Sequence, residues 1–308
     1  MAGKFRLVTR SDMDGLVCAA ILKQLDLIYE IKFVHPKDMQ DGTIEITSND
    51  IITNLPYVPQ AHLVFDHHES ETIRNAKADN HIIIADAPSA ARVVYDYYGG
   101  AEKLPAIRQD MMLAVDKADA AQFNIEDILN PKGWELLSFL MDSRTGLGRF
   151  REFSVSNYKL MMNLIDYCIN HTIDEIMLLP DVVERVELFN KYADDFKDQL
   201  TRCSTIHNNL IVLDLRDEEI IYPGNRFMIY ALNPKINISI HVLWGFLKQN
   251  TVFATGKSIV NRSSKTNIGE LMLKYGGGGH NAAGTCQIDN DKAENVLNQL
   301  IEAITNDD

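Results

Sequence analysis

The chain has 308 residues, which is more than one core of ordinary size needs, so we expect two domains. Hydrophobic residues make up 46% and charged residues 24%, as in ordinary globular proteins, and no apolar run approaches the roughly 18 residues that cross a bilayer. The net charge of −13 argues against a protein that coats long nucleic acid with a basic face, but it permits a small anionic substrate held by metal ions and a few arginines.

The N-terminal part of the chain alternates strand-like and helix-like patterns. Apolar runs bounded by turn residues predict strands at 5–9, 31–34, 44–47, 62–65 and 81–85, and apolar residues at helical spacing predict helices at 16–25 and 88–98. This alternation is typical of a mainly parallel sheet flanked by helices.

The rest of the chain is first helical, from about 104 to 200, and then mixed. Strands are predicted at 210–213, 236–244, 251–255 and 285–288, and helices at 268–273 and 292–304. We therefore expect an α/β protein with a catalytic, metal-binding domain (1–185), a linker helix (186–205) and a smaller mixed-sheet α/β domain (206–308), with a metal cleft between the domains.

Two acidic motifs follow predicted strands, where open α/β sheets carry their ligands. Asp12 and Asp14 follow the first strand and can bind a divalent cation, although an aspartate here can equally cap the next helix. Asp66-His67-His68 follows the fourth strand and offers mixed oxygen and nitrogen ligands, with a polar turn as the alternative. A histidine beside a bound phosphate can also act as a general acid.

Three further aspartates are candidates for the same edge. Asp50 comes after the predicted third strand, with a turn-capping role as the alternative. Asp116 and Asp119 share one helical face, with a surface Lys-Asp pair as the alternative. Several such side chains at one edge predict two cations that activate a water and hold the phosphoryl oxygens.

Four consecutive glycines, Gly276 to Gly279, precede His280 near the C-terminus. Such a run is costly in entropy unless the backbone must approach something closely, and its N–H groups can surround an anion. A basic, hydroxyl-rich stretch upstream, with Lys257, Arg262 and Ser263, can hold a phosphate or carboxylate, although a solvated loop is the alternative.

Together these motifs resemble the DHH phosphoesterase superfamily. Asp12-Met13-Asp14-Gly15 resembles its first motif, Asp66-His67-His68 its name-giving motif, and Gly276 to His280 the GGGGH loop of the DHH-associated C-terminal domain. Their order and separation are similar to those of the family over nearly the whole chain. The subgroup resembled contains oligoribonucleases, pAp phosphatases, cyclic-dinucleotide phosphodiesterases and exopolyphosphatase-like proteins.

The resemblance implies a lobe that holds two Mn²⁺ ions, with Mg²⁺, Co²⁺ or Zn²⁺ as alternatives, and a second lobe that binds the substrate. The catalytic residues that it implies are Asp66, His67 and His68. Its metal positions correspond to Asp12, Asp14, Asp66, His67 and Asp119, with Asp50 as the best match for a further ligand and Asp116 as an alternative to Asp119. Its substrate positions correspond to Arg262, Gly278, Gly279 and His280.

One residue departs from the family pattern. A histidine ligand usually stands just before the first aspartate pair, and this chain has Arg10 there. An arginine is always protonated and cannot coordinate a cation. Either the first metal site is weakened, another ligand substitutes, or Arg10 binds substrate phosphate.

The expected function is manganese-dependent hydrolysis of short RNA or DNA oligonucleotides or nucleotide phosphates, with polyphosphate as the next substrate class. The alternative is a non-catalytic nucleotide or phosphate sensor with a degraded metal site. No signal-peptide core precedes the first strand and the four cysteines form no C-x-x-C pair, so we expect a cytoplasmic protein. We expect no membrane partner, and a homodimer is left open.

Overall fold

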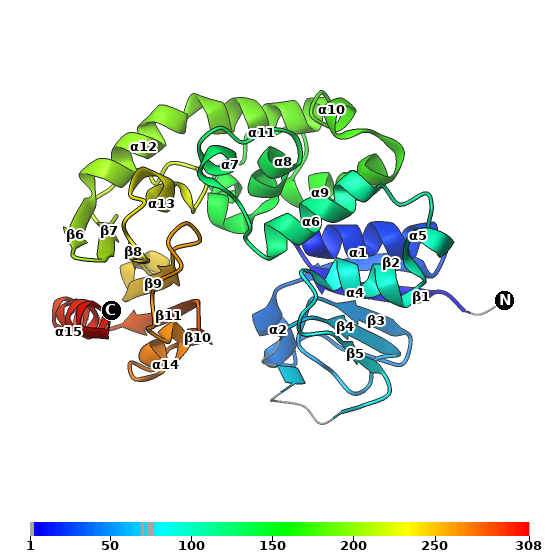
Figure 1. Cartoon of the computed structure of the whole chain (residues 1–308), viewed down its shortest axis with the longest axis horizontal. Coiled ribbons are helices and arrows are strands. Elements are labelled where there is room, and N and C mark those ends of the chain that lie inside the picture. The colour runs from blue at the N-terminus through cyan, green and yellow to red at the C-terminus, as the bar shows by residue number, and fades with distance from the viewer. Residues whose placement is uncertain (1–2, 69–70, 73–76, 308) are drawn as a thin grey trace. The chain divides into compact units, whose positions relative to one another are not determined.

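A computed structural model describes residues 3–68, 71–72 and 77–307 and confirms the predicted α/β class (Figure 1). The chain forms two compact units, of which the first consists of Met1–Gln122 with Pro131–Leu188 and the second of Phe123–Asn130 with Phe189–Asp308. Each unit has its own sheet. The domain boundaries predicted at 185 and 205, and the cleft between the domains, remain predictions.

The sheet of the first unit is parallel throughout, with the strand order β2-β1-β3-β4-β5. Its strands are β1 (Phe5–Arg10), β2 (Ile28–Val34), β3 (Asp50–Thr53), β4 (Leu63–Asp66) and β5 (His81–Ile83). In this order the connections change direction between β1 and β3, and ligands of open α/β sheets bind at such a switch point, outside the carboxyl ends of the strands.

Helices cover both faces of this sheet. The helices of this unit are α1 (Met13–Gln24), α2 (Pro36–Gln40), α4 (Ala90–Tyr97), α5 (Gly100–Lys103), α6 (Gln109–Asp119), α8 (Gly133–Met141), α9 (Asn157–Asn170) and α10 (Ile173–Ile176), with 3₁₀ turns at Ser143–Thr145 and Leu147–Arg149. Helix α11 (Pro180–Lys191) begins in this unit and ends in the second. Neighbouring strand residues point to opposite faces. Leu7 therefore packs in the large core with α1 and α4, whereas Val8 packs with Met39 of α2 in a smaller core.

The prediction of a strand at 44–47 is wrong, and the third strand is β3. The Asp50 carboxylate accepts hydrogen bonds from the Thr47 N–H (2.7 Å) and hydroxyl (3.2 Å), which makes a turn of the residues before it. Ile44 and Ile46 alternate because both pack against the smaller core from a loop. All four residues of β3 are buried, and a short strand buried on both faces has no alternating pattern to reveal it.

The second unit has a mixed six-stranded sheet in the order β10-β11-β9-β8-β7-β6. The strands are β6 (Ser204–His207), β7 (Leu210–Asp214), β8 (Ile238–Trp244), β9 (Thr251–Lys257), β10 (Gly278–His280) and β11 (Ala283–Ile288). The helices are α7 (Ile125–Leu129), α12 (Ala193–Arg202), α13 (Met228–Leu232), α14 (Ile268–Leu273) and α15 (Ala293–Asp307), with a 3₁₀ turn at Phe246–Lys248. The core of this unit lies between the sheet and the helices α14 and α15.

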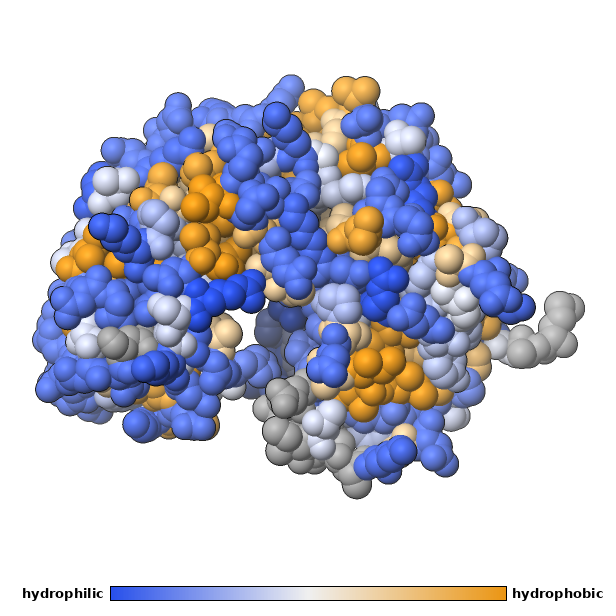
Figure 2. Space-filling model, viewed as in Figure 1, coloured by the Kyte–Doolittle hydropathy of each residue, from blue (hydrophilic) through white to orange (hydrophobic). Residues whose placement is uncertain are grey.

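Most of the surface in Figure 2 is hydrophilic, with apolar patches between the polar side chains. Among the described residues, no helix is both long enough and apolar enough to cross a membrane.

A histidine in β8 makes the stability of the second unit depend on pH. Burial lowers the pKa of His241 to about 4, and the positive charge of Arg226 acts in the same direction. The unfolded chain binds this proton near pH 6.5, so stability is lost as the pH falls from about 6.5 towards 4. We expect the unfolding free energy of wild type, minus that of His241→Gln, to decrease by up to about 1.4 kcal/mol for each unit by which the pH falls in this range. Denaturant unfolding at several pH values measures this difference, and a constant difference would contradict the prediction.

Candidate metal and phosphate site

The candidate site of the first unit lies at the carboxyl ends of its central strands. Asp12 and Asp14 follow β1, Asn54 follows β3, and Asp66 ends β4 with His67 and His68 directly after it. Because all these strands are parallel, their ends meet at one edge, on both sides of the switch point.

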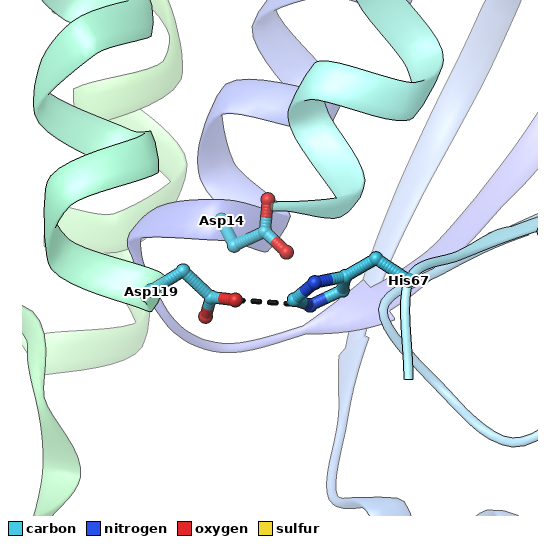
Figure 3. A group of neighbouring side chains, drawn as sticks. All are labelled: Asp14, His67 and Asp119. Carbon is cyan, nitrogen blue, oxygen red and sulfur yellow. Dashed lines mark ion pairs between the residues drawn. The ribbon is translucent and has the colours of Figure 1, made fainter. Parts of the chain in front are cut away.

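Three of the predicted ligands form a group at this edge. One ligand atom each of Asp14, His67 and Asp119 lies within 4.8 Å of the other two (Figure 3). They come from the first turn of α1, the loop after β4 and the last residue of α6. His67 Nε2 lies 2.9 Å from Asp119 Oδ2, the ion pair drawn as a dashed line. Two oxygens and one nitrogen suit a borderline divalent cation.

The surroundings of Asp14 and His67 fix their orientation. Asp14 accepts hydrogen bonds from the N–H groups of Ala90 (3.0 Å) and Ala91 (2.7 Å) at the N-terminus of α4, where the helix dipole favours a negative charge. His67 Nδ1 lies 3.1 Å from the carbonyl oxygen of Ala87, so Nδ1 carries the proton and donates a hydrogen bond to that oxygen. The Nε2 atom, which faces Asp119, is then the nitrogen that can bind a cation.

The charges of this group also fit a cation. Burial raises the pKa of Asp14 well above its usual value, and the negative charges of Asp119 and Asp12 raise it further. Burial alone would lower the pKa of His67, but the hydrogen bond and charge of Asp119 and the charge of Asp14 raise it to about 9. The metal-free group thus holds a proton between its carboxylates. A cation would replace that proton and release it.

Asp12 is engaged by donors instead. Its Oδ1 accepts hydrogen bonds from Gly15 N (3.0 Å), as the N-cap of α1, and from Asn54 Nδ2 (3.3 Å), while Oδ2 lies 3.0 Å from Arg10 Nε. Burial raises the pKa of Asp12, and Arg10 opposes this shift. Asp12 therefore caps α1, and its role as a metal ligand remains a prediction.

Asp66 organises the turn that contains both histidines. Its Oδ1 accepts hydrogen bonds from the backbone N–H of His67 (2.8 Å) and of His68 (3.3 Å), and it lies 2.7 Å from His68 Nδ1. His68 Nδ1 therefore donates to Asp66, which orients the partly exposed ring of His68. Asp66 Oδ2 is buried without a hydrogen-bond partner among the described residues, so it is a further oxygen that a cation could use.

Two other predicted ligands are paired elsewhere. The prediction that Asp50 reaches this edge is wrong, because Asp50 begins β3 beside Arg6 of β1 and lies 2.6 Å from Arg6 Nε. A parallel strand carries its first residue to the opposite end of the sheet. Asp116 accepts hydrogen bonds from Ser89 Oγ (2.7 Å) and Arg92 Nε (3.0 Å), one helical turn before Asp119.

In the second unit, the glycine run forms an edge strand rather than an open loop. Gly278, Gly279 and His280 make up β10 and pair with β11. Gly276 has a φ of +74°, and a Cβ on Gly277 or Gly279 would lie 2.2 Å from Thr285 O or 2.3 Å from Ala283 O. The fold therefore requires glycine at three of the four positions. A Cβ on Gly278 would meet no atom within 4 Å.

The basic stretch lies beside this hairpin. Lys257 Nζ donates to Asn281 Oδ1 (2.8 Å) in the turn between β10 and β11. Arg262 is exposed and its Nε donates to Ile259 O (3.2 Å), while Ser263 Oγ accepts from Asn237 Nδ2 (3.2 Å). Lys257 therefore contacts the glycine hairpin, whereas the hydrogen bonds of Arg262 and Ser263 are to Ile259 and Asn237, which lie outside the hairpin.

Sequence reasoning missed Asn54. This buried residue has a φ of +53° at the end of β3, and its Oδ1 has no hydrogen-bond partner among the described residues. The available signal is the polar pair Thr53-Asn54 directly after the apolar pair Ile51-Ile52. The strand expected at 44–47 hides this signal, because it ends well before Asn54.

Two solved structures are similar to this chain. The chain is 61% identical to the pGpG-specific phosphodiesterase PggH from Vibrio cholerae, with a TM-score of 0.87 over 99% of this chain and 100% of that one. It is 9% identical to CDC45 from Entamoeba histolytica, with a TM-score of 0.53 over 98% of this chain and 95% of that one, which is a likeness of fold. No protein-family model and no curated relative matches the chain.

Proposed function

Because the chain belongs to the DHH phosphoesterase superfamily and is a metal-dependent phosphohydrolase, we propose that it hydrolyses short oligonucleotides, with the dinucleotide pGpG as its preferred substrate. The observation that carries this proposal is the 61% identity to a pGpG-specific phosphodiesterase over 99% of the chain. The group of Asp14, His67 and Asp119 supports it, because phosphodiester hydrolysis needs a site where negative charge can be stabilised.

In this proposal Asp14, His67 and Asp119 hold the divalent cation, for which Mn²⁺ is our first choice. When bound, the cation polarises a phosphoryl oxygen and makes a water more acidic. The chain itself contributes by orienting the side chains that hold the cation. The N-terminus of α4 fixes the carboxylate of Asp14, and the Ala87 carbonyl fixes the ring of His67. Since Nδ1 of His67 is bonded to the backbone, we assign His67 to binding rather than to proton transfer.

His68 is then our candidate for the general acid. Its Nδ1 donates to Asp66 Oδ1, and we assign to its Nε2 the transfer of a proton to the leaving oxygen. The hydrogen bond to Asp66 holds the ring of His68 in position, as the aspartate of a histidine-aspartate pair does.

We assign substrate contact in the second unit to β10. The fold accounts for three glycines of the run, but not for the lack of a side chain at Gly278. Close approach of a ligand to the backbone is a reason for a glycine that the fold does not require. An edge strand also presents backbone N–H groups, which suit a phosphate or a base.

Gly278→Ala tests this assignment. We expect its melting temperature to match wild type, because the new methyl group meets no atom within 4 Å, and its KM for pGpG to rise about tenfold. The matched control is Gly279→Ala, which should lower stability because its Cβ would lie 2.3 Å from Ala283 O. An unchanged KM in a folded Gly278→Ala enzyme would remove β10 from the substrate site.

A substrate panel tests the function itself. The wild-type chain with Mn²⁺ is given pGpG, other dinucleotides, five-residue RNA, pAp, a cyclic dinucleotide and polyphosphate, with Asp119→Asn as the inactive control. We expect kcat/KM for pGpG to exceed that for five-residue RNA by about 100-fold. Faster turnover of polyphosphate or pAp would overturn the substrate assignment, and wild type as inert as the variant on every substrate would overturn the proposed hydrolase function.

A further inference from the structure

The two sides of the metal edge differ in charge: one is acidic, and on the other the carboxylate of Asp12 is paired with Arg10. Asp14 and Asp119 are the carboxylates of the cation group, with His67 as its neutral ligand when a cation replaces the proton. These two carboxylates balance one divalent cation, and Asp66 Oδ2, which has no hydrogen-bond partner among the described residues, is a further oxygen available to it. The other side, around Asp12, holds the cationic side chain of Arg10 and the neutral amide of Asn54.

The oxygens of Asp12 are already used. Gly15 N and Asn54 Nδ2 donate to Oδ1, and Arg10 Nε lies 3.0 Å from Oδ2. A carboxylate has about four acceptor positions, and these donors occupy three of them. A second cation bound to Asp12 would have to displace the guanidinium of Arg10. It would still lie close to that positive charge, because Arg10 is only two residues from Asp12 in the chain.

Arg144 is paired with Asp142, its Nε lying 2.7 Å from Asp142 Oδ1. Burial lowers the pKa of Arg144, but the charge of its partner Asp142 raises it above its usual value. The negative charges of Asp12 and Asp119 raise it further, by smaller amounts. Asn54 offers one neutral amide oxygen, a much poorer partner for a divalent cation than a carboxylate. Around Asp12, one negative charge is therefore already matched by arginine.

From these contacts we propose that the chain binds a single divalent cation, at Asp14, His67 and Asp119, and that the Arg10 guanidinium, held by Asp12, binds the substrate phosphate where a second cation would otherwise lie. This inference rests on the proposed function and replaces the expectation of two ions. Arginine suits the role because its planar N–H groups bind phosphate oxygens in pairs and its charge does not depend on pH. Arg10 Nε lies 3.0 Å from Asp12 Oδ2, and this ion pair holds the guanidinium at the metal edge.

The first test counts ions without measuring activity. Metal-free full-length chain is titrated with Mn²⁺, free Mn²⁺ is followed by electron paramagnetic resonance, and bound Mn²⁺ is measured after gel filtration. We expect one tight ion per chain, with any second ion at least about 100-fold weaker. Two ions with affinities within tenfold of each other would overturn the inference. No bound ion at all would instead overturn the metal assignment of the proposed function.

Substitutions test which residues exclude the second ion. Asp119→Asn should lose the tight ion. Arg10→His combined with Asn54→Asp supplies two metal ligands around Asp12, and it should bind a second ion. If this variant melts like wild type and still binds one ion, the exclusion is not due to Arg10 and Asn54.

The role of Arg10 in substrate binding has its own readout. Arg10→Ala should bind one Mn²⁺ ion as tightly as wild type but show a KM for pGpG raised about 100-fold, with partial recovery in Arg10→Lys. An unchanged KM would overturn the phosphate contact. A loss of the tight ion in Arg10→Ala would overturn the separation of Arg10 from the metal site.

Discussion

Replacing Asp119 by asparagine is expected to remove the tight metal ion and to lower kcat/KM by a factor on the order of 10³, because a bound cation supplies several kcal/mol of transition-state stabilisation. Asp119 is exposed at the end of α6, so the substitution should leave the fold intact. In the metal-free variant the pKa of His67 should fall from about 9, since its ion-pair partner is gone. Metal titration, steady-state kinetics and NMR titration of His67 measure the three effects.

Asp116→Asn is the matched control, one helical turn away on the same helix. Asp116 is bonded to Ser89 and Arg92, so its substitution should cost about 1 kcal/mol of stability through these hydrogen bonds. Metal binding and kcat should stay close to wild type. If Asp116→Asn loses the ion and Asp119→Asn keeps it, our assignment of the two aspartates is reversed.

Gly15→Ala is expected to have the largest effect on stability. Alanine is the better helix former by about 1 kcal/mol, so helix propensity alone predicts that the substitution in α1 stabilises the chain. Packing predicts the opposite, because the new Cβ would lie 2.0 Å from Arg10 O and 2.7 Å from Thr9 Oγ1. Overpacking costs up to about 3 kcal/mol, which outweighs the gain in propensity.

Denaturant unfolding decides between the two effects. We expect a net loss of about 2 kcal/mol in Gly15→Ala, together with weaker Mn²⁺ binding, because α1 carries Asp14 and must move away from β1. Gly278→Ala serves as the control, since its added methyl group meets no atom within 4 Å. A Gly15→Ala chain as stable as wild type would show that α1 is less tightly packed on β1 than the structure indicates.

Much of the fold could be predicted from local patterns. The strands near Phe5 and Leu63 and the helix after Asp12 follow from apolar runs and helical spacing. The third strand could not, because the alternation of Ile44 and Ile46 comes from a loop that packs on the smaller core. The local pattern does not predict β10 either, because glycines have low strand propensity. Only their pairing with β11 makes these residues a strand.

The residue types and their order along the chain are enough to predict the chemistry of this protein: aspartates and histidines after parallel strands, and a glycine run whose order and spacing are typical of the family. Which aspartates are paired with an arginine depends on how distant segments pack in three dimensions. Asp12, Asp50 and Asp116 each lie against an arginine, Arg10, Arg6 and Arg92 respectively, whereas Asp14 and Asp119 meet at His67. All five side chains are chemically identical, and what separates them is the charge a few ångströms away, which depends on long-range packing and not on neighbours in the chain.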